Sequence, residues 1–425
     1  MAAPASASAA APSCDWEEVL LDDCALIGDE RNHTTGASFT RNDESILASF
    51  WRERPPVLSR LYVWSLDLDA SAFSEPPRIL RMEEGLILFR VAINCRLPCI
   101  LNDECDYFVY HVDSARLDSL PPHPSAVTLS DDAVGLLPRG SGSYTVAALT
   151  SRRSVFTLHL LHSGIGKRWT SVEVSLTAPQ SKFPLIHKTS TVITLGGEGG
   201  TMGWVDLWRG ILLCDVLSPN PELRGVPVPL PTKILLPYDQ AKIEPPQRLY
   251  RGIAFIKEKG CLRFVDLDVT YQFLSDQDEE TGFISFRFDA WTITTWTNFN
   301  LTSSFDDWKQ EHSPVHADTI MFNEKMRKQL LLCQLLQPKA PPQDNNVTIN
   351  PERKLQNLWV SQPTPSIEGS KVFLIARAKF MYPEAHVLVV DMAIGELQGV
   401  SDYATGRKLG LELTCIHGGV SKRAA

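Results

Sequence analysis

The 425-residue sequence lacks an excess of positive charge, a long apolar run and a regular cysteine pattern. No stretch approaches the roughly 18 to 20 consecutive apolar residues that a membrane-spanning helix needs. The formal net charge of −9 argues against a general nucleic-acid binder or a binder of anionic membranes, because either would need a basic face. The apolar fraction of 44% is enough for a sizeable core, so wholesale disorder is excluded.

Recognisable catalytic motifs are missing as well, since there is no G-x-S-x-G nucleophile elbow and no H-E-x-x-H metal motif. The glycine-rich segment 196–203 does not fit a phosphate-binding loop because no lysine follows it, so we expect a tight loop between strands. We expect the adjacent acids Glu83–Glu84, Asp131–Asp132 and Asp306–Asp307 to be mostly solvated in loops. We therefore assign no catalytic residue and no cofactor. An enzymatic activity stays an open alternative, because catalytic groups meet in space rather than in sequence.

The nine cysteines are odd in number and scattered, which indicates a reducing compartment rather than a disulfide framework. Cytoplasm or nucleus is therefore the expected location. Cys95, Cys99, Cys105 and His111 lie within seventeen residues, but their spacing differs from that of known zinc sites. We expect ordinary core and loop thiols here.

Two further patterns fail as metal sites. His159 and His162 lie three residues apart in an apolar stretch, and residues at that spacing in a strand point to opposite faces. The acidic segment 275–282 begins like a calcium loop but lacks the glycine and the final glutamate that such a loop needs. The sequence therefore predicts no metal site.

Repeats are the informative feature of the chain. Short apolar stretches with a period of two recur at 61–69, 107–114, 155–163, 203–217, 261–269 and 386–400. The intervals between Asp67, Asp113, Asp215 and Asp268 are 46, 102 and 53 residues, so the middle interval spans two units. A period of about 50 residues, built from three or four short strands, is typical of a propeller blade.

We therefore predict an all-β, propeller-like arrangement of roughly six small antiparallel sheets, closed by pairing between the N- and C-terminal strands. A pair of β-sandwiches is the alternative. We expect residues 1–13 to form a disordered Ala/Ser-rich tail, 14–405 a single domain and 406–425 a C-terminal segment.

Helical signal is confined to one segment, 321–336, which reads either as a helix capped by Asn323 or as a strand preceded by basic residues. The Pro-rich stretch 338–346 that follows it predicts an exposed linker.

Residues 200–231, the signature block, read GTMGWVDLWRGILLCDVLSPNPELRGVPVPLP. This block resembles the plant domain-of-unknown-function family 1618, which is greatly expanded in grasses. Supporting pieces lie at 16–23, 251–268, 291–299 and 387–403, so the resemblance extends from about residue 14 to about residue 405. The family implies no catalytic residues. Its members look similar to propeller-like domains that accompany F-box modules, but no F-box-like helical segment precedes the repeats here.

Two functions are compatible with these observations. The first is a protein-interaction or scaffold module that presents a propeller surface to an unknown protein partner, without nucleic acid, membrane or an obligate small molecule. The alternative is a small-molecule binder or hydrolase-type enzyme that uses the central channel. The candidate interaction or structural residues lie in the signature block, and they are Trp204, Asp206, Trp208, Arg209 and Asp215. Exposed Trp208 and Arg209 at a rim would favour the first function, and inward carboxylates with shifted pKa values would favour the second.

Overall fold

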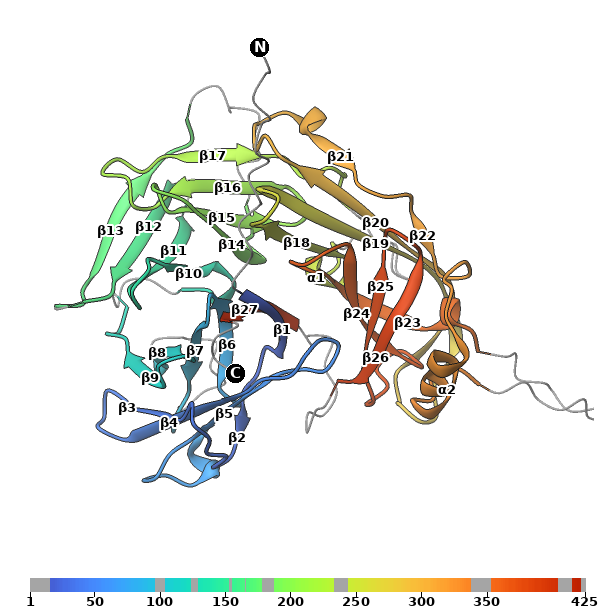
Figure 1. The fold of residues 1–425 in the computed structure, drawn as a ribbon, viewed down its shortest axis with the longest axis horizontal. Helices are drawn as coiled ribbons and strands as arrows, with labels where there is room; N and C mark the ends of the chain where they lie inside the picture. The colour runs from blue at the N-terminus through green and yellow to red at the C-terminus, as the bar shows by residue number, and fades with distance from the viewer. Residues whose placement is uncertain are drawn as a thin grey trace, which may run out of the picture.

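The structure is a computed structural model that describes residues 16–95, 104–123, 129–152, 155–164, 166–177, 187–232, 244–337, 353–403 and 415–421. The predicted tail 1–13, the linker 338–346 and Cys99 lie outside the described residues. Within them, six sheets of four or five strands follow one another around a ring in chain order (Figure 1). The predicted all-β, propeller-like class is confirmed.

The first three sheets contain four strands each. Sheet 1 consists of β2 (Leu26–Ile27), β3 (Gly36–Phe39), β4 (Ser45–Trp51) and β5 (Arg60–Trp64). Sheet 2 consists of β6 (Arg78–Glu83), β7 (Leu86–Val91), β8 (Asp106–His111) and β9 (Arg116–Ser119). Sheet 3 consists of β10 (Val134–Pro138), β11 (Tyr144–Arg152), β12 (Val155–His162) and β13 (Trp169–Val174).

The last three sheets complete the ring. Sheet 4 consists of β14 (Thr191–Gly196), β15 (Thr201–Asp206), β16 (Gly210–Asp215) and β17 (Leu223–Val226). Sheet 5 consists of β18 (Arg251–Ile256), β19 (Cys261–Gln277), β20 (Ile284–Asn298), β21 (Trp308–Gln310) and β22 (Val315–His316). Sheet 6 consists of β23 (Trp359–Pro365), β24 (Lys371–Arg377), β25 (His386–Asp391) and β26 (Glu396–Asp402).

Sheets 2, 3, 4 and 6 have the same topology, since their strands lie side by side in chain order and antiparallel. The strands β18 to β21 of sheet 5 follow the same order, and β22 also pairs with β20. Sheet 1 differs, because its first strand β2 pairs in parallel with its last strand β5. The apolar stretches that predicted the repeat include β8, β12, β16 and β25, which are the third strands of sheets 2, 3, 4 and 6. The sequence period therefore corresponds to one sheet.

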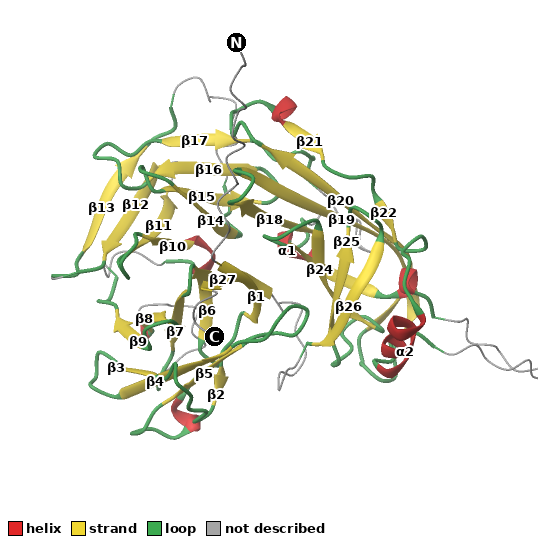
Figure 2. Cartoon of the chain, viewed as in Figure 1, coloured by secondary structure: helices red, strands yellow, loops and turns green. Residues whose placement is uncertain are grey.

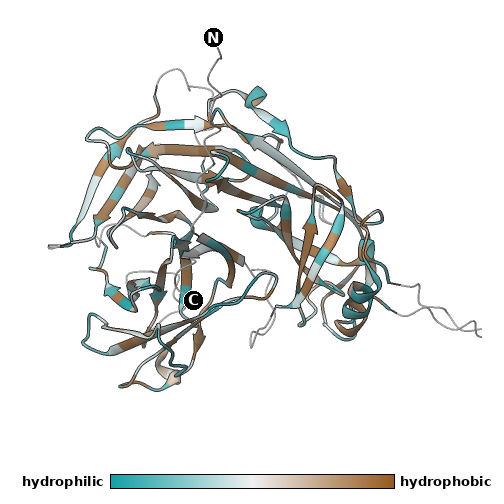
Figure 3. Cartoon of the chain, in the orientation of Figure 1, coloured by the Kyte–Doolittle hydropathy of each residue, from teal (hydrophilic) through white to brown (hydrophobic). Residues whose placement is uncertain are grey.

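Most central strands are apolar on both faces, as the brown colouring of Figure 3 shows. All six residues of β7 and of β8 are buried, for example. Separate hydrophobic cores fill the spaces between sheets 1 and 2, 2 and 3, 3 and 4, 4 and 5, and 5 and 6. Each sheet is therefore covered by its neighbours, which is the reason that the sheets stack around an axis.

The two ends of the chain close the ring. β1 (Trp16–Asp22) pairs antiparallel with β27 (Cys415–Ser421) over the whole length of both strands, so the predicted terminal pairing is confirmed. A sixth core joins Leu20 of β1 and Leu58, which precedes β5, to buried residues of sheet 6 such as Phe373. The Glu18 carboxylate also accepts hydrogen bonds from the Ser366 hydroxyl and from the Ile367 backbone N–H, both in the turn after β23.

Helices are few, as Figure 2 shows. α1 (Gln247–Tyr250) is one short turn, and α2 (Glu324–Leu332) confirms the helical reading of 321–336. The Asn323 side chain accepts a hydrogen bond from the Met326 N–H at 2.9 Å, as an N-cap does. Among the described residues, no helix is both long and apolar enough to cross a membrane. The predicted tight glycine loop is the turn between β14 and β15.

The first strands of sheets 2 to 6, which are β6, β10, β14, β18 and β23, contact one another in this order around the ring. A Cβ atom at Gly252 of β18 would overlap the backbone carbonyl oxygen of Pro363 in β23. A flexible side chain can yield to such an overlap, but the backbone of a paired strand cannot.

We expect Gly252→Ala to lower the free energy of unfolding by at least about 2 kcal/mol, because the two inner strands must separate. The matched control is Gly28→Ala, whose Cβ meets only Tyr62 at an ordinary 3.7 Å. That control should change stability by less than about 0.5 kcal/mol. Urea denaturation of both variants measures the difference, and equal stabilities would contradict the close approach.

Candidate functional site

A cavity lies where the inner strands meet. It is lined by residues of β6, β14, β18, β23 and β27, and it offers about 180 Å³ to the centres of water-sized molecules. Much of its wall is apolar, as in Ile79, Val192 and Ile253. The polar part is mostly charged, and its charged members come from β6, the 3₁₀ turn Asp131–Ala133 before β10, α1, both ends of β18, Asp23 after β1 and Glu368 after β23.

A β-bulge in β6 brings its charged residues to the cavity. In a regular strand, Arg78 and Arg81 would point to opposite faces because they lie three residues apart. The pairing of β6 with β7 shifts by one residue between Ile79 and Arg81. The extra residue resets the alternation, so Arg78, Arg81 and Glu83 all line the cavity.

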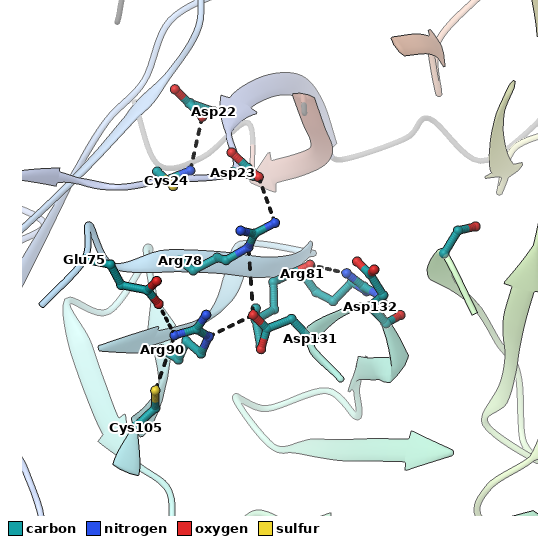
Figure 4. Close-up of polar contacts among 12 residues, drawn as sticks. Asp22, Asp23, Cys24, Glu75, Arg78, Arg81, Arg90, Cys105, Asp131 and Asp132 are labelled. Carbon is teal, nitrogen blue, oxygen red and sulfur yellow. Dashed lines mark hydrogen bonds and ion pairs between the residues drawn. The ribbon is translucent and has the colours of Figure 1, made fainter. Parts of the chain in front are cut away.

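Asp131 connects the first group of charges (Figure 4). Its carboxylate lies 2.8 Å from Nε of Arg90 and 3.8 Å from Nε of Arg78. Nη2 of Arg78 lies 3.3 Å from the Asp23 carboxylate. Arg90 also pairs with Glu75 and donates to Sγ of Cys105. Sheet 2, the turn before sheet 3 and the segment after β1 are therefore held together by alternating charges.

Asp132 serves two arginines in different ways. Its carboxylate pairs with Nη2 of Arg248 at 2.7 Å. Its backbone carbonyl accepts from Nη2 of Arg81 at 2.7 Å, and Figure 4 shows these two residues side by side. The other Arg81 bond goes to the carbonyl of Leu80, so both of its acceptors are neutral. Its Nε is buried and has no hydrogen-bond partner among the described residues. Burial and the nearby Arg248 lower the pKa of Arg81 to about 10.

A second group of charges lies where β6 and β18 end. Nζ of Lys257 lies 2.7 Å from Glu84 and 3.8 Å from Glu83. Burial raises the pKa of Glu83 to about 7, against the opposing effect of Lys257 and with a further increase from Glu84. The hydroxyl of Thr194 lies beside this carboxyl group. Glu83 is thus a carboxyl that exchanges its proton near neutral pH.

The expectation for the adjacent acids is wrong for two pairs and right for one. Glu83–Glu84 and Asp131–Asp132 line the cavity and bind basic side chains. Asp306–Asp307 lies on the surface in the turn before β21, away from the cavity lining. The basic residues of the cavity were not predicted. The one sequence signal for them is the broken alternation of RILRME in β6, where charges stand at positions one, four and six.

The signature-block residues lie inside the fold rather than on a rim. Trp204 is fully buried and Trp208 is 2% exposed. The Trp204 indole donates to the carbonyl of Ala133, which joins sheet 4 to sheet 3, and that of Trp208 donates to the carbonyl of Pro245. Asp215 is half exposed and accepts from the Thr201 hydroxyl at 2.6 Å.

Asp206 organises the turn between β15 and β16. Its buried carboxylate accepts from the backbone N–H groups of Lys188, Trp208 and Arg209 and from the Gln247 amide. The Arg209 guanidinium pairs with it at 3.2 Å. These contacts indicate a structural role for the block.

Cys95 lies near Cys105, next to the start of β8, whereas His111 ends that strand and has other partners. Cys105 contacts Arg90, whereas His111 lies 3.2 Å from Asp118 and 2.7 Å from Arg116. His159 is buried between Thr150 and Ser171, and His162 is exposed beside Thr145.

The fold and its charged cavity define the class of the protein: a ring of small sheets around a central pocket. Residues 204–350 match the model of the family described as "Protein of unknown function (DUF1618)". The resemblance predicted from the signature block is confirmed over these residues.

Three solved structures illustrate the other likenesses. A protein of unknown function from Dyadobacter fermentans is 10% identical, with 91% of this chain and 98% of that chain covered, at a TM-score of 0.30. A glycosyl hydrolase from Bacteroides ovatus is 11% identical, with coverages of 89% and 91% and a TM-score of 0.26. A putative glycoside hydrolase from Parabacteroides distasonis is 11% identical, with coverages of 88% and 98% and a TM-score of 0.28. Scores this low define neither a shared fold nor a shared function. No curated protein matches the chain.

The raised pKa of Glu83 predicts a pH-dependent stability. Between pH 4.5, its ordinary value, and about 7, the folded carboxyl keeps a proton that the unfolded chain has lost. The folded state then binds more protons, so the free energy of unfolding falls as the pH rises through this window. We expect Glu83→Gln to remove about 1 to 3 kcal/mol of that fall.

Urea denaturation at pH 5, 6, 7 and 8 checks this prediction. Glu18 is the matched control, because burial also raises its pKa to about 7 but it lies at the junction of β1 and sheet 6. Glu83→Gln should remove only the pH dependence of the free energy of unfolding that comes from Glu83. Glu18→Gln should remove only the part that comes from Glu18. An unchanged slope in Glu83→Gln would contradict the assignment.

Proposed function

We propose that the protein binds a small ligand with an anionic group in the central cavity, and that Arg81 with Arg248 receives this group. The observation that carries the proposal is the hydrogen bonding of Arg81, whose guanidinium donates to two backbone carbonyls and to no carboxylate within the described part of the chain. A charged group away from bulk water is costly unless an opposite charge or a full set of hydrogen bonds compensates it.

Asp131, Asp132 and Glu83 raise the pKa of Arg81 by their charge, but among the described residues none of these carboxylates accepts a hydrogen bond from its guanidinium. Asp132 is bound to Arg248, Asp131 to Arg90, and Asp23 to Arg78. A carboxylate or phosphate of a ligand would offset the charge of Arg81 and bring the acceptor geometry that guanidinium groups bind best. The apolar walls would cover the rest of a small molecule, as in most ligand sites.

The cavity also favours binding over the interaction function expected from the sequence. A small-molecule binder is expected to have inward carboxylates with shifted pKa values, and Glu83 is such a carboxylate. An interaction rim is expected to expose Trp208 and Arg209, and both side chains are largely covered.

Arg81→Gln tests the proposal through the unfolding temperature. We expect inorganic phosphate or a small dicarboxylate such as succinate to raise the unfolding temperature of the native chain above that in chloride of equal ionic strength. The variant should lose this anion-specific increase and should be no less stable than the native chain without ligand, because an uncompensated buried charge is removed.

Arg224→Gln is the control, because Arg224 pairs with Asp215 outside the cavity. It should keep the anion effect. Equal shifts in Arg81→Gln and the native chain, or no anion that acts beyond chloride, would refute the proposal.

One surface favours a second function, binding of a protein partner. β19 and β20 form a hairpin much longer than the other strands, and its outer part exposes Phe273, Leu274, Phe283 and Ile284. Lys379 holds the hairpin tip against sheet 6 through Asp278 at 3.1 Å. Exposed acids, Asp276 and Glu279, flank the apolar side chains, so a partner with apolar residues next to lysine or arginine would fit.

The double variant Phe273→Ser/Ile284→Ser tests this surface. A stoichiometric partner co-purified with the tagged native chain should be lost from the variant, while the unfolding temperature changes little because both side chains are exposed. Phe305→Ser is the control, since Phe305 is exposed elsewhere. Retention of the partner by the double variant would contradict a role for the hairpin.

A further inference from the structure

Three side chains with metal-ligating atoms meet at one end of sheet 6, outside the cavity lining. They are Cys333 directly after α2, His386 at the start of β25 and Asp402 at the end of β26. Their ligand atoms all lie within 4.8 Å of one another. Figure 1 shows α2 beside sheet 6, close to the strands that carry the other two residues.

The fold itself causes this convergence. His386 and Asp402 are direct partners in the antiparallel register of β25 and β26, so their side chains share one face of the sheet. Backbone hydrogen bonds between Met321 and both Gly395 and Leu397 hold the segment before α2 on β26. Burial of Leu330 in the core between sheets 5 and 6 then sets the end of the helix over the sheet.

The distances suit a small tetrahedral ion. Nδ1 of His386 lies 3.1 Å from Oδ1 of Asp402, and Sγ of Cys333 lies 4.0 Å from the same oxygen. Zinc bonds of about 2.0 to 2.3 Å at tetrahedral angles place neighbouring ligand atoms roughly 3.3 to 3.8 Å apart. The observed separations lie around this range.

The charges at the cluster also favour a cation. Among the described residues, no lysine or arginine forms an ion pair with Asp402, and the Glu384 carboxylate adds negative charge nearby.

A second triplet, Asp22, Asp23 and Cys24, shows the contrast. There Arg78 already compensates Asp23 at 3.3 Å, so an ion would have to displace a guanidinium. The residues at sheet 6 have no such competitor among the described side chains.

We propose that Cys333, His386 and Asp402 bind one Zn²⁺ ion, with water in the fourth position. A donor set of sulfur, nitrogen and oxygen selects zinc over calcium and magnesium, which prefer oxygen alone. Binding converts the Cys333 thiol to a thiolate and releases its proton to solvent. The ion ties the end of α2 to β25 and β26, and it stabilises the folded state because the unfolded chain does not hold the three ligands together.

Titration of the full-length, chelator-treated chain with Co²⁺ and then Zn²⁺ tests the site. We expect one Co²⁺ per chain, with a thiolate-to-cobalt absorption band that Zn²⁺ abolishes. Zn²⁺ should also raise the unfolding temperature. Absence of binding to the folded chain would overturn the proposal.

Three variants assign the ligands. Cys333→Ser should lose the charge-transfer band, and Cys333→Ser, His386→Gln and Asp402→Asn should each weaken Zn²⁺ binding at least tenfold. Asp402 is highly exposed, so its variant tests the site without a cost to folding. Cys95→Ser is the matched control with another partly buried thiol, and it should bind as the native chain does. A band that persists in Cys333→Ser or disappears in Cys95→Ser would place the metal elsewhere and refute the site.

Discussion

Each small sheet of this protein has two apolar faces, and neither can be left in water. A sheet in the interior of the series is covered on both sides by its neighbours, and five cores of this kind join sheets 1 to 6. The outer faces of the first and last sheets remain. Leu20 and Leu58 cover sheet 6, and the pairing of β1 with β27 links the two chain ends. The ring is the arrangement that leaves no apolar face uncovered.

Ring closure has a cost at the centre, where the inner strands come close. Gly252 is needed where β18 passes β23. The space between the sheets also contains buried arginines, Arg251 and Arg263. Arg251 joins Asp266 of sheet 5 to the carbonyl of Leu207 after β15, and Arg263 joins Glu311 to carbonyls of Ser366 and Gly369 next to sheet 6. Such guanidinium groups satisfy backbone oxygens that the apolar cores cannot reach.

The same convergence produces the cavity and its chemistry. Charged residues that are distant in sequence share a small space with apolar walls, so their charges influence one another strongly. This environment affects Arg81 and Glu83 in opposite directions. It lowers the pKa of Arg81, whose hydrogen bonds among the described residues go to neutral carbonyl oxygens, and it raises the pKa of Glu83 to about 7. The cluster at Cys333 arises differently, from one cross-strand pair and one helix end outside the ring centre.

The amino-acid sequence by itself determined the class of fold, the repeat of about 50 residues, the terminal pairing, the helix capped by Asn323 and the family resemblance of residues 204–350, because alternation, turn residues and caps are local properties. Tertiary structure alone decided the sites. A one-residue bulge turned Arg78 and Arg81 to the same side, and ring closure placed Asp131 and Arg248 beside them. Cys333, His386 and Asp402 are separated by 53 and 16 residues and form no motif. Which distant side chains meet depends on register, bulges and the stacking of whole sheets, and a local pattern does not carry that information.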